Sequence, residues 1–143
     1  MNREIKFRGK DCTGEWWYGN LEINRKITDE KTYESYSISN VYSSAFTSMI
    51  DKETIGQFTG LHDKNGKEIY EGDIIRFLCS GINTWEMPVE WNNESATYLL
   101  IGRCLCDVRH ENCTDWMKKY FRKDGVFEVI GNIHDNSEFL KTE

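Results

Sequence analysis

The sequence has one proline, Pro88, and no stretch rich in proline, glycine and serine that would separate two domains. It also lacks a run of about 18 apolar residues, the length that a membrane-spanning helix needs. A charged and then apolar signal segment is missing from its start. We therefore expect a single soluble domain over residues 1–143, with no membrane partner and a location in the cytoplasm.

An excess of basic residues is missing as well. The 24 acidic residues outnumber the 18 basic ones, which gives a formal net charge of -6. Because proteins that hold a phosphate backbone normally have a basic surface, the composition argues against nucleic acid as a partner. One alternative stays open, since basic and aromatic residues interleave in Arg3–Arg8 and Lys118–Lys123. Aromatic rings exposed on a small β-barrel can stack single-stranded bases.

The sequence contains no recognised catalytic signature. It has only three histidines, and two of them, His62 and His134, directly precede an aspartate. Neighbouring residues in a turn do not define a base and its orienting carboxylate, because that pair needs a spatial arrangement. A glycine-rich loop that would cradle a phosphate group is also absent. We expect no enzymatic activity and no cofactor.

The cysteines offer one candidate metal site. Five cysteines are an odd number, and we expect them to be reduced in a cytosolic protein. Four soft ligands fall within ten residues: Cys104, Cys106, His110 and Cys113. Zinc binds such a set of ligands in tetrahedral geometry. The spacing is poor for zinc, because a Cys-x-Cys pair on a flat strand holds its side chains too far apart. The favoured interpretation is that these are ordinary strand and loop residues.

The most informative segment is Ile55–Phe77, which has two turn signals between strand-like residues. Asp63–Gly66 has the composition of a hairpin turn, since Asp bonds the backbone two residues on and Asn-Gly accepts positive φ. Glu71–Asp73 has the composition of a corner that opens into an apolar strand. The segment contains four acidic side chains that could instead form a metal site: Asp63, Glu68, Glu71 and Asp73. Because aspartate is common in turns, we favour turn formation.

These residues carry a family resemblance. The run TGLHDKNGKEIYEGDIIRF at residues 59–77 resembles the signature of the YopX-like family of small phage and prophage proteins. Arg3–Lys10 and Gly14–Leu21 are similar to the opening hairpin of that family, and Phe127–Asn136 is similar to its closing strand and turn. The resemblance implies a phage or prophage accessory protein and no particular biochemical activity. Residues 24–48 and 104–113 match no motif of the family.

Frequent turn signals and period-2 alternation predict a mainly β fold, either a small bent β-barrel or packed sheets. The alternation places Trp16 and Trp17 on opposite faces of one strand. Further strands are predicted at Val89–Trp91 and Thr97–Ile101. A single helix is predicted near residues 115–123, because apolar residues there recur at helical spacing.

Residues 24–48 are predicted to form a polar arm or edge segment. Tyr33–Tyr42 has tyrosines and β-branched residues but too few apolar side chains to fill a core. As a strand it would lie at a sheet edge, where unpaired backbone groups invite another chain. The alternative is a solvated loop, since six serines lie between Ser35 and Ser48. We favour the arm or edge, and expect self-association.

The leading hypothesis for function is a non-catalytic protein-interaction or assembly module. Its expected partners are a second copy of the chain and a host or phage protein. The alternatives are a single-stranded nucleic-acid-binding barrel and a small zinc-binding module.

Overall fold

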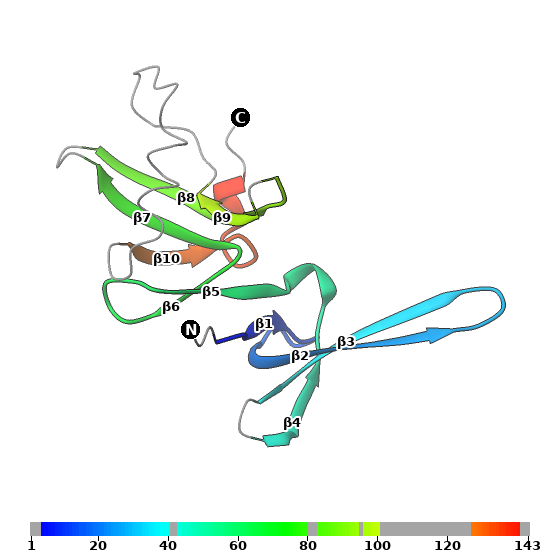
Figure 1. The fold of residues 1–143 in the computed structure, drawn as a ribbon. Helices are drawn as coiled ribbons and strands as arrows, with labels where there is room; N and C mark the ends of the chain where they lie inside the picture. Colours follow the sequence, from blue (N-terminus) through cyan, green and yellow to red (C-terminus); the bar gives the residue numbers. More distant parts are fainter. Residues whose placement is uncertain (1–3, 41–42, 80–82, 95, 101–126, 141–143) are drawn as a thin grey trace. The chain divides into compact units, whose positions relative to one another are not determined.

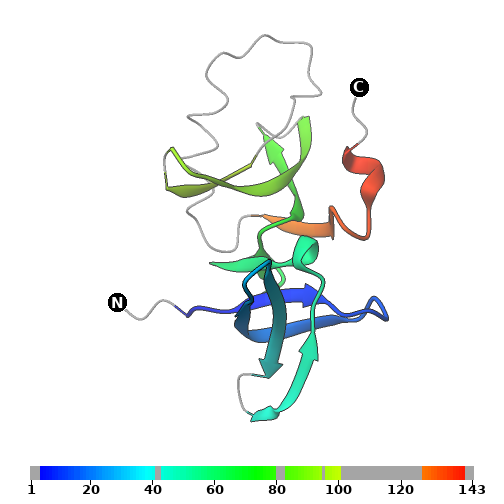
Figure 2. The ribbon, with the colours of Figure 1, turned by 90° about the vertical axis from the view of Figure 1, so that its right-hand side faces the viewer.

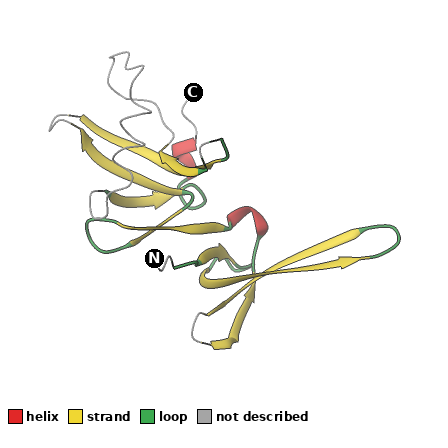
Figure 3. Ribbon diagram, viewed as in Figure 1, coloured by secondary structure: helices red, strands yellow, loops and turns green. Residues whose placement is uncertain are grey.

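The computed structural model describes residues 4–40, 43–79, 83–94, 96–100 and 127–140, and the chain divides into two compact units, Met1–Phe58 and Thr59–Glu143. Strands dominate the described residues, with two short 3-10 turns beside them (Figure 3). The prediction of a mainly β fold is therefore confirmed. The helix predicted near residues 115–123 lies outside the described residues.

The first unit is an antiparallel sheet with the strand order β4-β3-β2-β1-β5 (Figure 1). A 3-10 turn, η1 (Lys52–Thr54), links β4 to β5, and Asp51 caps it by accepting the Glu53 N–H at 3.0 Å. The strands are β1 (Phe7–Lys10), β2 (Trp16–Ile27), β3 (Thr32–Asn40), β4 (Ser43–Met49) and β5 (Gly56–His62), which continues into the second unit.

The second unit contains a four-stranded antiparallel sheet with the order β10-β7-β8-β9, and β6 lies beside β5. Its elements are β6 (Glu68–Tyr70), β7 (Asp73–Cys79), β8 (Asn83–Asn92), β9 (Thr97–Leu100), β10 (Glu128–Asn132) and the 3-10 turn η2 (Ser137–Leu140). The strands predicted at residues 89–91 and 97–101 correspond to β8 and β9, and Val89 pairs with Leu100.

Two expectations change in the structure. Among the described strands, neither strand order returns to its starting strand, so the sheets are open and the closed-barrel alternative is wrong. The segment predicted as an edge strand is indeed a strand, β3, but it does not form the edge of its sheet. The serine-rich residues after it form β4, which pairs with Ser37–Asn40 and takes the edge position. Within the described residues, no strand pairs with Thr32–Ser35 of β3 on the side away from β2.

Each unit has its own apolar core. In the first unit, Ile38, Ile50 and Phe58 are buried, and Gly9 of β1 lies directly against Ile50. The second unit buries a larger set from several strands: Ile69, Tyr70, Ile74, Ile75, Met87, Val89, Tyr98 and Phe127. Over the described ranges, the structure contains no helix that combines the length and the apolar character needed to span a membrane.

The packing of Gly9 gives a stability prediction. A Cβ at this position would lie 2.1 Å from Cγ2 of buried Ile50, so Gly9→Ala overpacks the core of the first unit. We expect it to lower the free energy of unfolding by about 1–3 kcal/mol, measured by urea denaturation. The comparison variant is Gly14→Asn, in which a Cβ would meet no heavy atom within 4 Å and asparagine keeps the backbone strain at a φ of 83° small. Equal stability of both variants would contradict the prediction.

Candidate functional site

Asp63 organises the turn between β5 and β6. Its side chain is 3% exposed, and its Oδ1 accepts hydrogen bonds from the N–H groups of Asn65 at 2.8 Å and Lys67 at 2.9 Å. The Asp63 N–H donates to the Lys67 carbonyl at 2.7 Å, and Gly66 adopts a φ of 80°. The predicted hairpin turn is therefore confirmed, with the aspartate as its internal acceptor.

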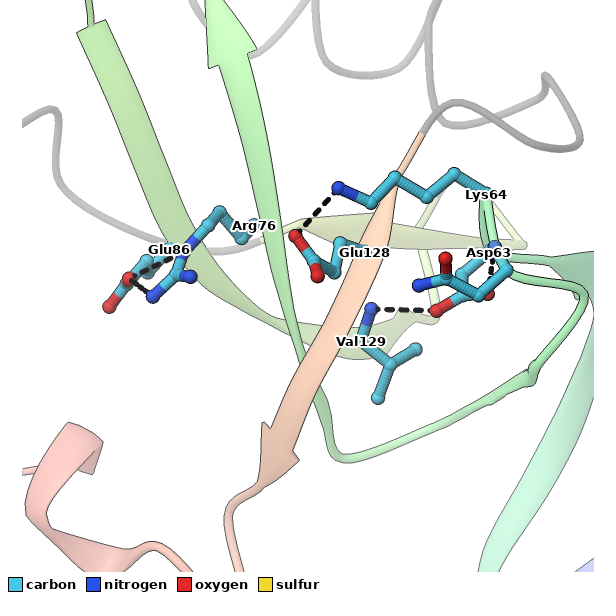
Figure 4. A network of polar contacts seen from close by, with 7 residues as sticks. Asp63, Lys64, Arg76, Glu86, Glu128 and Val129 are labelled. Carbon is cyan, nitrogen blue, oxygen red and sulfur yellow. Dashed lines mark hydrogen bonds and ion pairs between the residues drawn. The ribbon is translucent and has the colours of Figure 1, made fainter.

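The same turn also holds the last strand of the second unit (Figure 4). Oδ2 of Asp63 accepts the Val129 N–H at 3.1 Å, across 66 residues of sequence. The Lys64 N–H donates to the Phe127 carbonyl at 2.7 Å, and Lys64 Nζ lies 2.9 Å from a carboxylate oxygen of Glu128. We call these five residues the Asp63 clamp. It fixes the start of β10 against the turn.

Asp73 also accepts a backbone hydrogen bond, at the corner before β7. It is almost fully buried, and its Oδ2 accepts the Tyr70 N–H at 2.8 Å, while Gly72 takes a φ of 85°. The Tyr70 hydroxyl donates to Glu68 at 2.7 Å.

Within the residues that the structure describes, no group of three or more His, Cys, Asp or Glu side chains could hold a metal ion. The two buried aspartates instead bind backbone N–H groups, which is the interpretation that we favoured.

The pKa of Asp63 follows from these contacts. Burial raises it, but the backbone N–H groups of Lys67, Val129 and Asn65 stabilise the charged form, and the net effect lowers the pKa below its ordinary value. The carboxylate is therefore charged at neutral pH, as three accepted hydrogen bonds require.

The opening hairpin between β1 and β2 repeats this arrangement. Asp11 accepts hydrogen bonds from the Thr13 hydroxyl at 2.6 Å and from the Trp17 indole N–H at 3.0 Å. The N–H groups of Thr13 and Glu15 also donate to it. The bond from the Thr13 hydroxyl contributes most to lowering the pKa of Asp11 to about 2. The segments that match the family signature thus shape turns with charged acceptors.

A different kind of feature is the hairpin of β2 and β3, whose outer part projects from the sheet of the first unit (Figure 1). β1 pairs with β2 only up to Gly19, and β4 reaches β3 only from Ser37 onward. Gly19 has a φ of 156° where the pairing of β2 passes from β1 to β3. Residues 24–35, which we call the arm, are therefore a ribbon of two strands. Figure 2 views this ribbon from its tip.

One face of this hairpin carries apolar residues at its root and near its tip, with the paired Arg25 and Glu34 between them. The register places Leu21, Ile23 and Ile27 on the same face as Ile38 and Tyr36. Exposure increases outward along this face: Ile38 is 0% exposed, Ile23 52% and Ile27 75%. The apolar residues of this face thus become exposed toward the tip. We call Ile23 and Ile27, which lie on either side of Arg25, the apolar stripe of the hairpin.

Polar contacts on the same face keep the hairpin in register. Arg25 binds Glu34 through Nε at 2.8 Å and Nη2 at 2.6 Å, and these two residues are paired across the strands. The Tyr36 hydroxyl donates to Glu34 at 2.5 Å, and Lys52 Nζ lies 5.6 Å from the centre of the Tyr36 ring. The Tyr36 hydroxyl and then Arg25 lower the pKa of Glu34. These contacts are exposed, so each adds little stability.

Cations and aromatic rings alternate on one face of β1. Arg8 and Lys10 lie over the Trp16 ring, with their charged groups 4.7 Å and 5.3 Å from its centre. Lys6 Nζ lies 5.5 Å from the centre of the Phe58 ring. Arg8 is only 4% exposed, so part of this face is buried within the protein. Lys6 and Arg8 of the segment Arg3–Arg8 therefore make cation–π contacts with rings from other parts of the first unit.

The other predicted site residues are not placed. The basic segment 118–123 lies outside the described part of the chain. The four zinc candidates also lie outside it: Cys104, Cys106, His110 and Cys113. The exposed residues that sequence reasoning missed are Ile23 and Ile27 of the β2–β3 hairpin. The alternation that begins at Trp17 and continues through Leu21 and Ile23 to Ile27 was the available signal.

The Asp63 clamp generates a prediction for pH dependence. The folded-state pKa of Asp63 is depressed, so its stabilisation is present above the ordinary carboxyl pKa of about 4 and is lost as the pH falls through the folded-state value. Asp63→Asn should lower stability at pH 7 by about 1–3 kcal/mol, because its amide cannot satisfy all three N–H groups. Urea denaturation at pH 7 and pH 3 should therefore reveal a smaller loss on acidification in the variant than in the wild type.

Glu86→Gln is the matched control, since Glu86 forms an exposed ion pair with Arg76 at 2.6 Å (Figure 4). We expect this variant to change stability by less than about 1 kcal/mol. If Asp63→Asn were as stable as the control, the clamp would not hold the second unit together.

The comparison with family models agrees with the sequence pattern. The model of a family described as YopX protein matches residues 6–141. A solved structure, that of protein EF1440 from Enterococcus faecalis, is 23% identical with a TM-score of 0.49, and the match covers 98% of this chain and 100% of that one. Among curated proteins, none matches the chain significantly. Since the family model covers nearly the whole sequence, this protein belongs to the YopX family.

Proposed function

We propose that this protein is a non-catalytic protein-interaction or assembly module that binds through its arm. It acts in the cytoplasm of a host cell as a phage or prophage accessory protein, as the family resemblance implies. Its partners are a second copy of itself and a host or phage protein. The observation that carries the proposal is the exposed apolar stripe of the β2–β3 hairpin, in which Ile23 is 52% and Ile27 75% exposed.

The construction of the arm supports an interaction role. A two-stranded hairpin is at best marginally stable in water, and a third strand or a packed face normally supports it. Residues 24–27 and 32–35 pair only with each other among the described strands. Both outer sides of this ribbon present backbone groups to which another chain can bind. A partner that covers the stripe would supply the support that the rest of the first unit does not.

Further apolar residues lie at the edge of the same sheet. Phe46 and Met49 of the edge strand β4 are both more than half exposed, at 64% and 63%. Tyr33 on the arm is 55% exposed. Tyrosine, phenylalanine and methionine are enriched at the centres of protein interfaces. Tyr33 pairs with Lys26 and Met49 with Ser37, so these two residues lie on the face opposite to Ile23 and Ile27. The first unit therefore presents exposed apolar side chains on both faces of its sheet.

Shortening the arm tests the proposal. Ile23 and Tyr36 are paired across the hairpin, so an Asn-Gly turn can replace residues 24–35 and keep the root of the hairpin closed. We expect the full chain to have a solution mass above that of the 16.9 kDa monomer, and the shortened chain to be a monomer. Light scattering at high micromolar concentration measures both masses, and circular dichroism checks that the sheets remain.

A pull-down from nuclease-treated host lysate tests for other partners. Proteins retained by the full chain and lost by the shortened chain bind through the arm. A monomeric full chain that retains no protein in an arm-dependent manner would refute the proposed function.

A second candidate function is binding of single-stranded nucleic acid, which the basic and aromatic face of β1 favours. Lys6, Arg8 and Lys10 lie on this face with the rings of Trp16 and Phe58. If this face binds nucleic acid, Lys6→Ala should weaken binding and reduce its salt dependence. Fluorescence anisotropy with mixed-sequence single-stranded oligonucleotides at low salt measures this. We expect no binding at tens of micromolar, because the net charge is -6, and saturable binding would favour the second candidate.

A further inference from the structure

We infer that the outer edge of β2, residues 20–27, pairs antiparallel with the same edge of a second copy, with Asn24 opposite Asn24 on a two-fold axis. This inference rests on the proposed function and names the partner of the arm and the register of the contact. We call residues 20–27 on this side the β2 edge.

The β2 edge is open along its full length. The pairing of β1 with β2 ends at Phe7 and Gly19, and within the described residues no strand pairs with residues 20–27 on the side away from β3. The edge is eight residues long and contains no proline or glycine. Such an edge can extend the ladder into another chain, since its backbone groups repeat regularly.

The charges of the β2 edge are complementary to themselves. Glu22 and Lys26 are exposed, lie on the same face of β2, and are placed symmetrically about Asn24. In an antiparallel pair centred on Asn24, Glu22 of each copy lies opposite Lys26 of the other, so two ion pairs form across the contact. Inside the hairpin the residues opposite Glu22 and Lys26 are Ser37 and Tyr33, which carry no opposite charge.

The apolar residues at the two ends of the β2 edge fit the same register, while Ile23 lies opposite Arg25 of the other copy. The pairing centred on Asn24 puts Leu21 of each copy opposite Ile27 of the other, on the apolar face of the ribbon. Ile27 is 75% exposed in the single chain, and it gains an apolar neighbour in the pair. Contacts in which residue i meets j and residue j meets i are the defining property of a two-fold interface.

Neighbouring registers lack this complementarity. A centre at Ile23 puts Lys26 opposite Asn20 and removes both ion pairs. A centre at Arg25 puts two arginines opposite each other on the axis, and like charges directly opposite are unfavourable. The open part of β3 is shorter, since β4 covers it from Ser37 onward, and its middle residue Glu34 would face itself. The β2 edge centred on Asn24 is therefore the favoured self-contact.

Charge reversal tests the register. Glu22→Lys and Lys26→Glu each turn two attractive contacts into repulsive ones, and each should weaken self-association about tenfold or more. The double variant E22K/K26E restores both ion pairs with reversed polarity and should associate within about threefold of the wild type. An equimolar mixture of the two single variants should form a heterodimer, because the charges are then complementary. Sedimentation equilibrium over a range of concentrations measures these affinities.

Matched controls are Glu30→Lys and Lys31→Glu, which make the same charge changes in the turn at the arm tip, outside β2. They should leave self-association within about threefold of the wild type. Thermal melting of each variant confirms that the fold is retained, since all four positions are exposed.

The outcomes separate this inference from the proposed function. A wild type that associates through the arm but is unaffected by Glu22→Lys, or a double variant that is not restored, overturns the β2 register and leaves the arm as the interaction surface. A monomeric wild type whose arm captures a different protein also overturns the register. A monomer with no arm-dependent partner overturns both.

Discussion

The fold of the second unit depends on one buried carboxylate. Asp63 is charged and almost inaccessible to water, yet all of its bonding needs are met by N–H groups of its own turn and of Val129. An unpaired charge in such a position would cost several kcal/mol, so the turn and the last strand must stay together for the carboxylate to remain ionised. The pKa of Asp63 is lowered because N–H groups of both the turn and the last strand stabilise its charged form. The same physical constraint therefore sets the hairpin geometry and the position of β10.

This dependence explains why the family signature says little about chemistry. The residues in it with the strictest requirements are the two aspartates, which bind backbone N–H groups, and three glycines with positive φ: Asp63, Asp73, Gly60, Gly66 and Gly72. A segment of this kind identifies how a chain folds. A surface that selects a partner lies elsewhere, where backbone requirements are fewer and side chains are free to differ between related proteins.

The β2–β3 hairpin is the surface that we propose for this role in the first unit. Its root is fixed by the buried Ile38 and by the bond from the Ile50 N–H to the Tyr36 carbonyl at 2.8 Å. Its outer part has only exposed cross-strand contacts, of which the Arg25–Glu34 pair is the best defined. The arm therefore extends from a buried base, and its outer part is supported only by exposed contacts. The proposed partner adds the strand that the ribbon lacks.

Local sequence determined the turns, most strands and the family. Asp11, Asp51 and Asp63 act on backbone groups within a few residues, so the chemistry of a short segment predicts their geometry. The strand order, the position of β4 outside β3 and the open β2 edge were not predictable in this way. They depend on contacts between distant residues, such as Asp63 with Val129 or Gly9 with Ile50. Alternation tells which side chains share a face, and only the tertiary structure decides which of those faces another element covers.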